Sequence, residues 1–246
     1  MNIVVFTGPT LAADEASAVL DADYRPPTRQ GDVYRAALQS PKVIGIIDGY
    51  FERVPSVWHK EILWAMSRGI HVFGGASMGA LRAAELTAFG MEGVGRIFEA
   101  YRDGALEDDD EVAVVHGPPE FGFRAGSDAM VDIRATIARA VGAGVLSAAT
   151  GAALECLAKE MFYPHRNYHA IASRAVETGL PETEVRAFLD WLPDHRFSQK
   201  RADALAMLDA IRQRVENGLE EKRVSYSFEN TSMWEQASRL QVPIDR

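Results

Sequence analysis

Residues 70–89 read Ile-His-Val-Phe-Gly-Gly-Ala-Ser-Met-Gly-Ala-Leu-Arg-Ala-Ala-Glu-Leu-Thr-Ala-Phe, and this stretch indicates the class of fold. The short apolar run at 70–73 predicts a buried strand, and the glycine-rich residues 74–79 predict a tight turn. Residues 80–89 predict a helix, which Gly90 ends. A buried strand followed directly by a turn and a helix is typical of an α/β protein.

Strand–helix units of the same kind precede this stretch. Residues 3–6 and 42–47 predict strands, and helices are expected over about 14–20, 32–40 and 56–68. Both strands are continuous apolar runs, which suit a parallel sheet covered by helices on both faces. Ligands of such sheets bind where the strands end, at their carboxyl edge.

The pattern changes after residue 98. Residues 112–115 (Val-Ala-Val-Val) predict one more strand, and the apolar period is helical from about residue 128 onward. The helices expected there cover 128–142, 147–162, 167–178, 182–192 and 198–218. The sequence therefore predicts an α/β fold with a mostly parallel sheet and flanking helices in the N-terminal half, followed by an all-helical C-terminal half. We place the domain boundary between residues 1–125 and 126–246.

Charge and composition exclude several classes of function. The chain has 246 residues and a formal net charge of −9. A general nucleic-acid binder needs clustered Lys and Arg to neutralise phosphates, so no nucleic-acid partner is expected. The acidic balance also argues against docking on anionic lipid. No basic segment precedes the apolar residues 3–6, and no apolar run is long enough to span a membrane, so we expect a cytoplasmic protein.

The cysteine count limits the chemistry further. Cys156 is the only cysteine, which excludes a disulfide within the chain and a metal site built from several cysteines. Its position between Leu154 and Leu157 predicts a buried, inert thiol. The acidic run at 107–111 predicts a solvated or partner-facing loop rather than a metal site. We therefore expect neither a metal nor another cofactor.

Ser77 is the main candidate for chemistry. Residues 75–79 fit the pattern Gly-x-Ser-x-Gly, and the predicted strand before them and helix after them supply the context that a serine nucleophile needs. In that context a sharp turn exposes the hydroxyl, and the first N–H groups of the helix can stabilise an oxyanion. A second interpretation remains open at this point, in which Ser77 only caps the helix.

A serine nucleophile needs a base, and two candidates follow from the residues. His116 is the best placed histidine, because it follows the predicted strand at 112–115. Lys60 is the other candidate: a lysine can accept the serine proton when it is desolvated, and a position near a helix N-terminus also disfavours its charged form. Periodicity alone favours a plainer role for Lys60, as a solvated lysine that pairs with Glu61 or Glu52. Arg82 and Glu85 lie one helical turn apart and can pair locally.

Several blocks of sequence resemble the TfuA-like family. They lie at residues 31–36 (Gly-Asp-Val-Tyr-Arg-Ala), 47–51 (Ile-Asp-Gly-Tyr-Phe), 57–63 (Val-Trp-His-Lys-Glu-Ile-Leu), 76–86 (Ala-Ser-Met-Gly-Ala-Leu-Arg-Ala-Ala-Glu-Leu), 108–114 (Asp-Asp-Asp-Glu-Val-Ala-Val) and 116–118 (His-Gly-Pro). The resemblance covers about residues 1–120. The helical second half carries no motif that matches the family as clearly as these blocks do.

The resemblance implies a role in sulfur delivery. The family is associated with YcaO enzymes, which phosphorylate a peptide amide oxygen with ATP, and TfuA-like partners support the replacement of that oxygen by sulfur. The implied activity is hydrolysis of a thiocarboxylate on a ThiS-like sulfur-carrier protein, which releases sulfide for the YcaO enzyme and its precursor peptide or protein substrate. The implied catalytic residues are Ser77 as nucleophile and Lys60 as base.

The expected reaction begins when neutral Lys60 takes the proton of Ser77, whose oxygen then attacks the thiocarboxylate carbon. The residues expected to bind the oxyanion or the substrate are Met78, Gly79, Gly8, Asp48 and Gly49, and those expected to support the site are Arg82, Glu85 and His116. We also expect the glycine-rich loops to leave a narrow slot for a flexible diglycine tail. This expectation is an inference from the glycine content of the loops, and no motif indicates it.

Three alternatives belong to other classes. In the first, Ser77 and His116 form a hydrolase for a small ester. In the second, the protein has no catalytic activity and only strengthens the interaction between a YcaO enzyme and its peptide. In the third, Cys156 relays sulfur. The distance from Ser77 to Lys60 or to His116 would help to separate the first alternative from the Ser–Lys mechanism.

Overall fold

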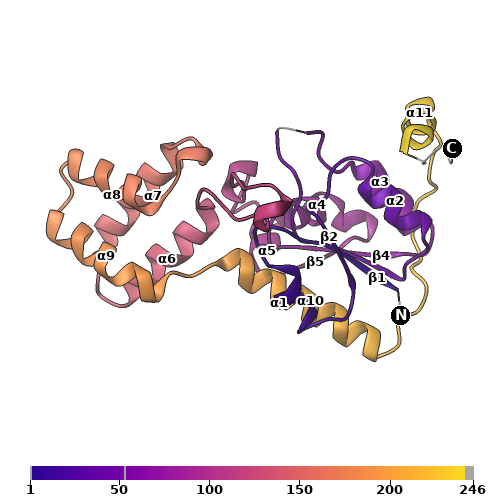
Figure 1. Cartoon of the computed structure of the whole chain (residues 1–246), viewed down its shortest axis with the longest axis horizontal. Helices are drawn as coiled ribbons and strands as arrows, with labels where there is room; N and C mark the ends of the chain where they lie inside the picture. The colour runs from indigo at the N-terminus through magenta and orange to yellow at the C-terminus, as the bar shows by residue number, and fades with distance from the viewer. Residues whose placement is uncertain (1, 53, 242–246) are drawn as a thin grey trace. The chain divides into compact units, whose positions relative to one another are not determined.

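A five-stranded sheet is the centre of the fold in the computed structural model, which describes residues 2–52 and 54–241 (Figure 1). The strand order is β2-β1-β3-β4-β5, and every neighbouring pair is parallel. The strands are β1 (Ile3–Phe6), β2 (Asp23–Arg25), β3 (Val43–Ile46), β4 (His71–Gly75) and β5 (Glu92–Val94). A helix connects each strand to the next, as a parallel sheet requires, which confirms the predicted α/β class.

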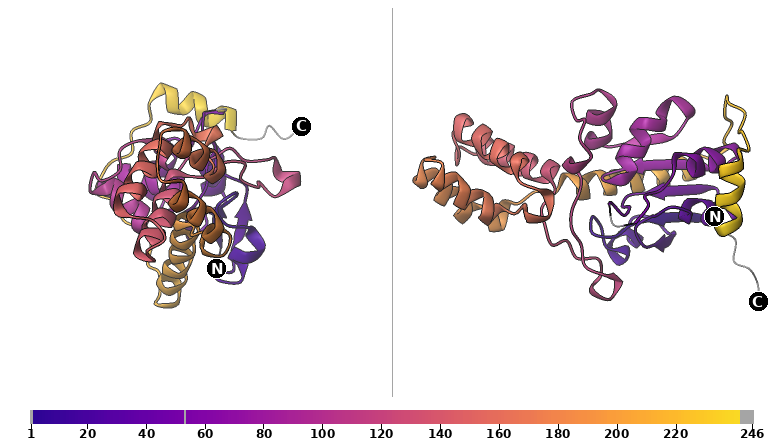
Figure 2. Two further views of the ribbon diagram at one scale, coloured as in Figure 1. Left: turned by 90° about the vertical axis from the view of Figure 1, so that its left-hand side faces the viewer. Right: turned by 90° about the horizontal axis from the view of Figure 1, so that it is seen from above.

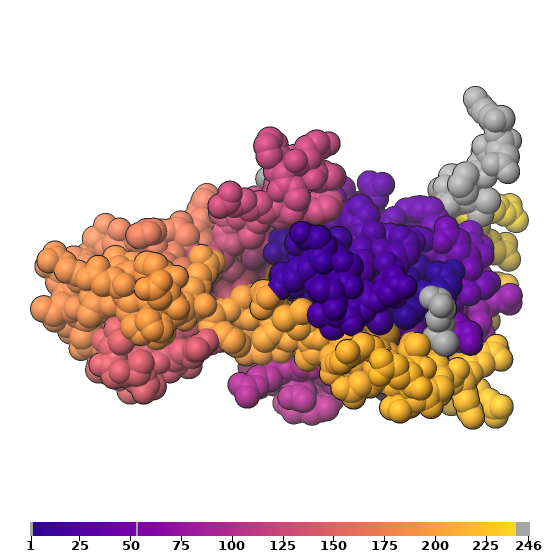
Figure 3. All heavy atoms as spheres, turned by 60° about the horizontal axis from the view of Figure 1, so that its bottom comes forward, coloured from indigo at the N-terminus to yellow at the C-terminus, as the bar shows by residue number. Residues whose placement is uncertain are grey.

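Helices cover both faces of this sheet (Figure 1). The helices packed with the sheet are α1 (Ala13–Ser17), α2 (Asp32–Leu38), α3 (His59–Ser67), α4 (Met78–Leu86), α5 (Arg96–Arg102) and α10 (Gln199–Glu216). On one face, Val5 and Phe73 from the strands pack with Leu11 and with Met207 and Ile211 of α10. Figure 3 shows α10, in orange, alongside the indigo N-terminal segment. Helices α2, α3 and α4 lie on the other face.

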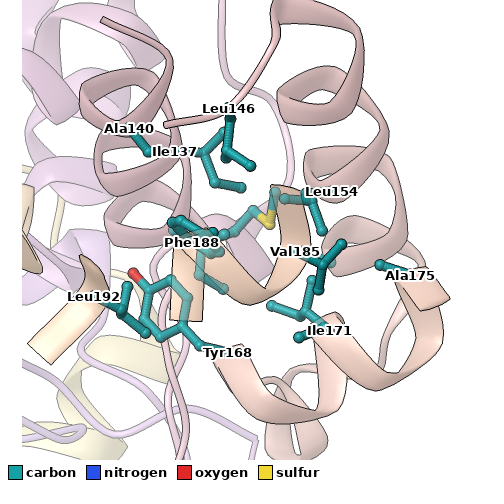
Figure 4. Close-up of a cluster of buried hydrophobic side chains, with 14 residues drawn as sticks. Ile137, Ala140, Leu146, Leu154, Tyr168, Ile171, Ala175, Val185, Phe188 and Leu192 are labelled. Carbon is teal, nitrogen blue, oxygen red and sulfur yellow. The ribbon is translucent and has the colours of Figure 1, made fainter. Parts of the chain in front are cut away.

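The later part of the chain is helical, as predicted. Its helices are α6 (Met130–Gly142), α7 (Ala148–Glu160), α8 (Tyr168–Glu177) and α9 (Glu182–His195), which Figure 2 shows in pink to orange. They bury a common apolar cluster around Leu154, Tyr168 and Phe188 (Figure 4). The short 3₁₀ helices are η1 (Thr87–Phe89), η2 (Asp109–Glu111), η3 (Pro119–Phe121) and η4 (Tyr163–His165).

The chain forms two compact units. Unit 1 contains the sheet and comprises the residues up to Glu107 together with those from Arg201 onward, and unit 2 is Asp108–Lys200. This grouping differs from the single division after residue 125 that we expected. The reason is that α10 buries its apolar face on the sheet and so brings the C-terminal residues back to unit 1.

The predicted strand at 112–115 is wrong. No strand forms there, and His116 makes only an isolated antiparallel bridge with Ala125. Side chains satisfy the backbone instead: Lys200 Nζ donates to the carbonyl oxygen of Val112, and the N–H of Val115 donates to Ser127 Oγ, each at 2.9 Å. With these groups already paired, the segment has no need of a neighbouring strand.

Four strands and α-helices of the structure were not predicted, namely β2, β5, α5 and α11 (Ser232–Gln241). Strand β5 has three residues with Gly93 at its centre, so it is too short to give a clear apolar pattern. None of the described helices is long and apolar enough to cross a membrane.

Candidate active site

The turn between β4 and α4 presents Ser77 in an unusual backbone conformation. Ala76 has a φ of +65°, which is uncommon for a residue with a side chain, and it is completely buried. The N–H of Ser77 donates to the carbonyl oxygen of Gly75 at 2.8 Å, which closes the turn within three residues. Strained residues of this kind concentrate at functional sites. The predicted sequence of strand, sharp turn and helix is therefore present around Ser77.

The hydroxyl of Ser77 does not cap α4. Ser77 occupies the N-cap position, but its side chain makes no capping hydrogen bond, and no described residue pairs with its Oγ. Among the described side-chain oxygens and nitrogens, Thr28 Oγ1 is the one that is both fully buried and unpaired. The unpaired hydroxyl of Ser77 therefore keeps some contact with solvent, although the residue is only 7% exposed. This arrangement disfavours the interpretation of Ser77 as a helix cap.

The backbone beside Ser77 offers one free donor. The N–H of Met78 has no hydrogen-bond partner among the described residues, and it belongs to the first turn of α4, where the helix dipole favours negative charge. The N–H of Gly79 is engaged, because it donates to the carbonyl oxygen of Ile47 at 3.2 Å. Among the residues predicted to bind the oxyanion or the substrate, Met78 therefore has a free N–H in this structure, whereas the N–H of Gly79 is already paired.

The glycines at this end of the sheet allow close packing. A Cβ atom on Gly79 would lie 1.7 Å from the carbonyl oxygen of Ile46, and one on Gly49 would lie 2.7 Å from Cγ of Met78. At Gly8 the added atom would lie 2.4 Å from Cγ of Pro27. The chain's own atoms fill the space where these three glycines would carry a side chain. The slot for a diglycine tail stays a prediction.

Asp48 holds one loop at this edge of the sheet. Its buried carboxylate accepts hydrogen bonds from Thr10 Oγ1 at 2.6 Å and from the N–H of Thr10 at 3.0 Å. The side chain thus ties the loop after β1 to the end of β3. Both carboxylate oxygens are engaged with Thr10 in this structure, and the role of Asp48 in substrate binding stays a prediction.

Lys60 is the second residue of α3 and is half-buried. Its Nζ lies 4.9 Å from the centre of the Phe228 ring. No hydrogen bond joins Lys60 Nζ to Ser77 Oγ, both of which the structure describes. Twelve residues separate the end of β3 from the start of α3, and Ser77 lies two residues after the end of β4. A pair formed by Lys60 and Ser77 stays a prediction.

Glu61, which we considered as a partner of Lys60, binds the backbone instead. Its carboxylate accepts the N–H groups of Gly31 at 2.8 Å, of Tyr34 at 3.2 Å and of Trp58 at 3.3 Å. Burial raises the pKa of Glu61, and these backbone hydrogen bonds only partly counteract it. The simple surface pair of Lys60 with Glu61 is therefore absent.

Arg82 and Glu85 form the predicted local pair and also tie α4 to the start of α3. Arg82 Nη1 donates to Glu85 at 2.7 Å, and Arg82 Nε donates to the carbonyl oxygen of Val57 at 3.1 Å. His59 Nε2 also lies 2.7 Å from Glu85. Burial raises the pKa of Glu85, but the hydrogen bonds with His59 and Arg82 outweigh it, so the pKa is lowered. These contacts hold His59, the residue before Lys60, against α4.

His116 lies in unit 2, whereas Ser77 lies in unit 1. The imidazole Nδ1 is 2.9 Å from the carbonyl oxygen of Gly117, and the ring packs on Phe123. A supporting or basic role for His116 toward Ser77 stays a prediction.

One residue of the acidic run, Glu111, is internal, so the prediction of a solvated or partner-facing loop is wrong for that residue. Glu111 is buried and pairs with Arg134 and Lys159, and Asp110 pairs with Lys159 and with the fully buried Arg166. The sequence does not show this, because the basic partners lie far along the chain in α6, α7 and the segment before α8. The described residues contain no cluster of histidine, cysteine or carboxylate side chains suited to a metal ion.

Cys156 is exposed, which corrects the prediction of a buried thiol. Leu154 is buried in the core of unit 2, but Cys156 lies two residues further along α7 and so points away from that core. Phe228, which contacts Lys60 from the C-terminal part of the chain, was not predicted from the sequence as a residue of the site. The available signal was the run of aromatic residues between 226 and 234, in a segment without clear periodicity.

Two comparisons with known proteins bear on this site. The family model described as TfuA-like protein matches residues 48–167, a range that contains both Lys60 and Ser77. A search of curated proteins finds no match to the sequence.

Proposed function

Because the chain belongs to the TfuA-like family, we propose that it is a hydrolase that releases sulfide from the thiocarboxylated C-terminus of a ThiS-like carrier protein. The sulfide then serves a YcaO enzyme, which uses it to convert a backbone amide of a precursor peptide or protein to a thioamide. The proposal adds a specific reaction and specific partners to the family assignment.

The free hydroxyl of Ser77 carries the proposal. A serine that neither caps its helix nor pairs with another described group, and that follows a residue with a φ of +65°, has the setting of a nucleophile. A residue needed only for the turn would gain stability by capping α4. The N–H of Met78 adds a free donor at the position where a developing oxyanion would lie in such a turn.

Each step of the proposed reaction uses a group of this chain. Lys60 Nζ accepts the proton of Ser77, and Ser77 Oγ attacks the thiocarboxylate carbon. Hydrosulfide leaves as the C–S bond breaks, and the carrier remains attached to Ser77 as an ester. Water then hydrolyses this ester, so that thiocarboxylate and water yield carboxylate and hydrogen sulfide. Met78 N–H stabilises both tetrahedral intermediates.

Lys60 must approach Ser77 for this reaction, because no hydrogen bond joins them in the free protein. Catalytic hydrogen bonds are often long in the absence of substrate and shorten when it binds. Arg82 and Glu85 support the approach, because they hold the start of α3 against α4. We assign them a positioning role and no contact with the substrate.

Sulfide release from a thiocarboxylated carrier tests the proposal directly. We expect Ser77→Ala to reduce the rate by about 10³-fold or more, as loss of a nucleophile does in serine hydrolases, and Lys60→Ala to cause a large loss as well. Ser173→Ala and Lys42→Ala change exposed residues of the same types and serve as matched controls. Undiminished release by the Ser77 and Lys60 variants would reject the mechanism.

A reconstituted thioamidation reaction separates the hydrolase from a non-catalytic adaptor. If the protein only delivers sulfide, added sodium sulfide should restore product formation by the YcaO enzyme in the presence of the Ser77→Ala variant. An adaptor that strengthens peptide binding would instead support product formation equally well with or without Ser77.

A further inference from the structure

The C-terminal residues 219–241, which we call the strap, run from the end of α10 along unit 1 to α11 (Figure 2). Three contacts fix the start of the strap. His71 Nε2 lies 2.9 Å from the carbonyl oxygen of Glu220, and the N–H of Lys222 donates to the carbonyl oxygen of Gly69 at 3.0 Å. Lys222 Nζ also donates to Glu92 at 3.2 Å. The start of the strap is therefore attached to β4, to β5 and to the residue Gly69 just before β4.

The middle of the strap follows α3. The hydroxyl of Tyr226 donates to the carbonyl oxygen of Leu63 at 2.7 Å, and burial raises the pKa of Tyr226 to about 12. Two residues further along, the ring of Phe228 lies 4.9 Å from Nζ of Lys60. Lys60 and Leu63 are three residues apart and so lie on one side of α3. The strap thus passes along the side of α3 that carries the proposed base.

An aromatic cluster fixes Phe228 in this position. Its ring packs edge-on against Trp234 of α11, with 5.3 Å between ring centres. Trp234 is buried and also packs on Tyr34 at 5.3 Å and on Trp64 at 6.0 Å. These contacts span α2, α3 and α11, so the position of Phe228 depends on docking of the whole strap.

The contact between Phe228 and Lys60 opposes the proposed reaction. The face of an aromatic ring attracts an ammonium group and therefore stabilises the charged form of a lysine. A base that accepts the Ser77 proton must be uncharged and must point toward Ser77. In this structure the ammonium group lies beside Phe228 and makes no hydrogen bond to Ser77.

We propose that the strap is a releasable cover for Lys60, and that Phe228 is the positioning residue that holds Lys60 Nζ beside its ring, without a hydrogen bond to Ser77, until the strap moves. This inference rests on the proposed function of Lys60. In the proposed resting state the strap covers Lys60. This state ends when Phe228 moves away from α3.

Chemical labelling of lysine tests the cover without any measurement of activity. Acetic anhydride reacts with uncharged amines, and mass spectrometry measures the extent of reaction at each lysine. We expect Phe228→Leu to raise labelling of Lys60 several-fold, with exposed Lys42 as the internal reference. Phe228→Tyr keeps the aromatic face and should behave like the unmodified protein. Met233→Ala alters a residue of α11 that is 66% exposed and should change nothing.

Sulfide release provides the second readout. We expect Phe228→Leu to increase release several-fold at neutral pH, while Phe228→Tyr leaves the rate of release unchanged. Unaltered labelling of Lys60 in Phe228→Leu would overturn the cover. Increased labelling together with full activity of Lys60→Ala would instead keep the cover and reject the hydrolase mechanism, so the two failures are distinguishable.

Discussion

The setting of Ser77 depends on its neighbours in the turn. The backbone of Ala76 turns through a left-handed conformation, and the hydroxyl of Ser77 is then left without a partner at the start of α4. The residue types alone left two interpretations open, because serine is equally suited to capping a helix. The missing cap bond, which only the folded chain reveals, favours the nucleophile.

Ion pairs beside the strap give a pH-dependent contribution to stability. Burial raises the pKa of Glu92, but hydrogen bonds and charge from His71 and Lys222 outweigh it, and the pKa is lowered. A lowered pKa in the folded state means that the unfolded chain binds more protons in acid. Glu92 therefore stabilises the fold above the ordinary glutamate pKa of about 4.3 and loses this effect as the pH falls below it.

The variant Glu92→Gln tests this contribution. We expect its melting temperature at neutral pH to be lower than that of the unmodified protein, and the difference to shrink as the pH falls toward 3, where ordinary glutamate is almost fully protonated. Thermal unfolding followed by circular dichroism between these pH values measures the difference. A difference that stays constant over the whole range would show that Glu92 acts through packing rather than charge.

Helix α4 packs unusually close to the sheet, and glycine makes this possible. The carbonyl oxygen of Ile46 occupies the position where Gly79 would carry a Cβ atom, and the carbonyl oxygen of Gly79 lies 2.1 Å from the corresponding position on Gly74. Both obstacles are backbone atoms, which cannot rotate away as a side chain can. The second glycine of the Gly-x-Ser-x-Gly pattern is therefore required by packing.

Gly79→Ala should destabilise unit 1 by more than about 3 kcal/mol, because α4 must move away from β3 to accommodate the methyl group. Urea unfolding followed by tryptophan fluorescence measures the loss, since Trp58 and Trp64 lie in the same unit. Gly142→Ala is the matched control: no atom lies within 4 Å of its added carbon, and the change should stay within about 1 kcal/mol. Equal stability of the two variants would contradict the packing argument.

Unit 2 combines an apolar cluster with ion pairs around two buried charged residues, Glu111 and Arg166. Arg166 is completely buried and donates to the carbonyl oxygens of Ala158, Asp110 and Met161 as well as to the Asp110 carboxylate. A buried guanidinium is tolerated only when its donors are paired in this way.

Asp110→Ala should therefore destabilise unit 2 by about 2 kcal/mol, the usual effect of losing a hydrogen bond to a charged group. Hydrogen exchange within residues 108–200 should increase and can be measured by mass spectrometry. Glu160→Ala removes the exposed partner of Arg174 and should leave exchange nearly unchanged, because surface ion pairs contribute little. If both variants exchange alike, the charged network does not stabilise unit 2.

The elements of the fold could be predicted well from the sequence, and the exceptions have physical causes. Helices such as α4 and α7 have long apolar periods and were predicted close to their observed bounds. Strand β5 was missed because three residues give no period, and the strand at 112–115 was predicted in error because Lys200 and Ser127 satisfy its backbone from a distance.

The local order of residues was enough to predict a parallel α/β sheet, a helical second part and the turn that presents Ser77, because each depends on neighbours along the chain. Long-range packing decided the rest. It returned α10 to the sheet, turned Cys156 outward, paired Asp110 with Arg166 and placed Phe228 beside Lys60. Such contacts join residues far apart in sequence, and their energies depend on burial and distance, which exist only once the chain has folded.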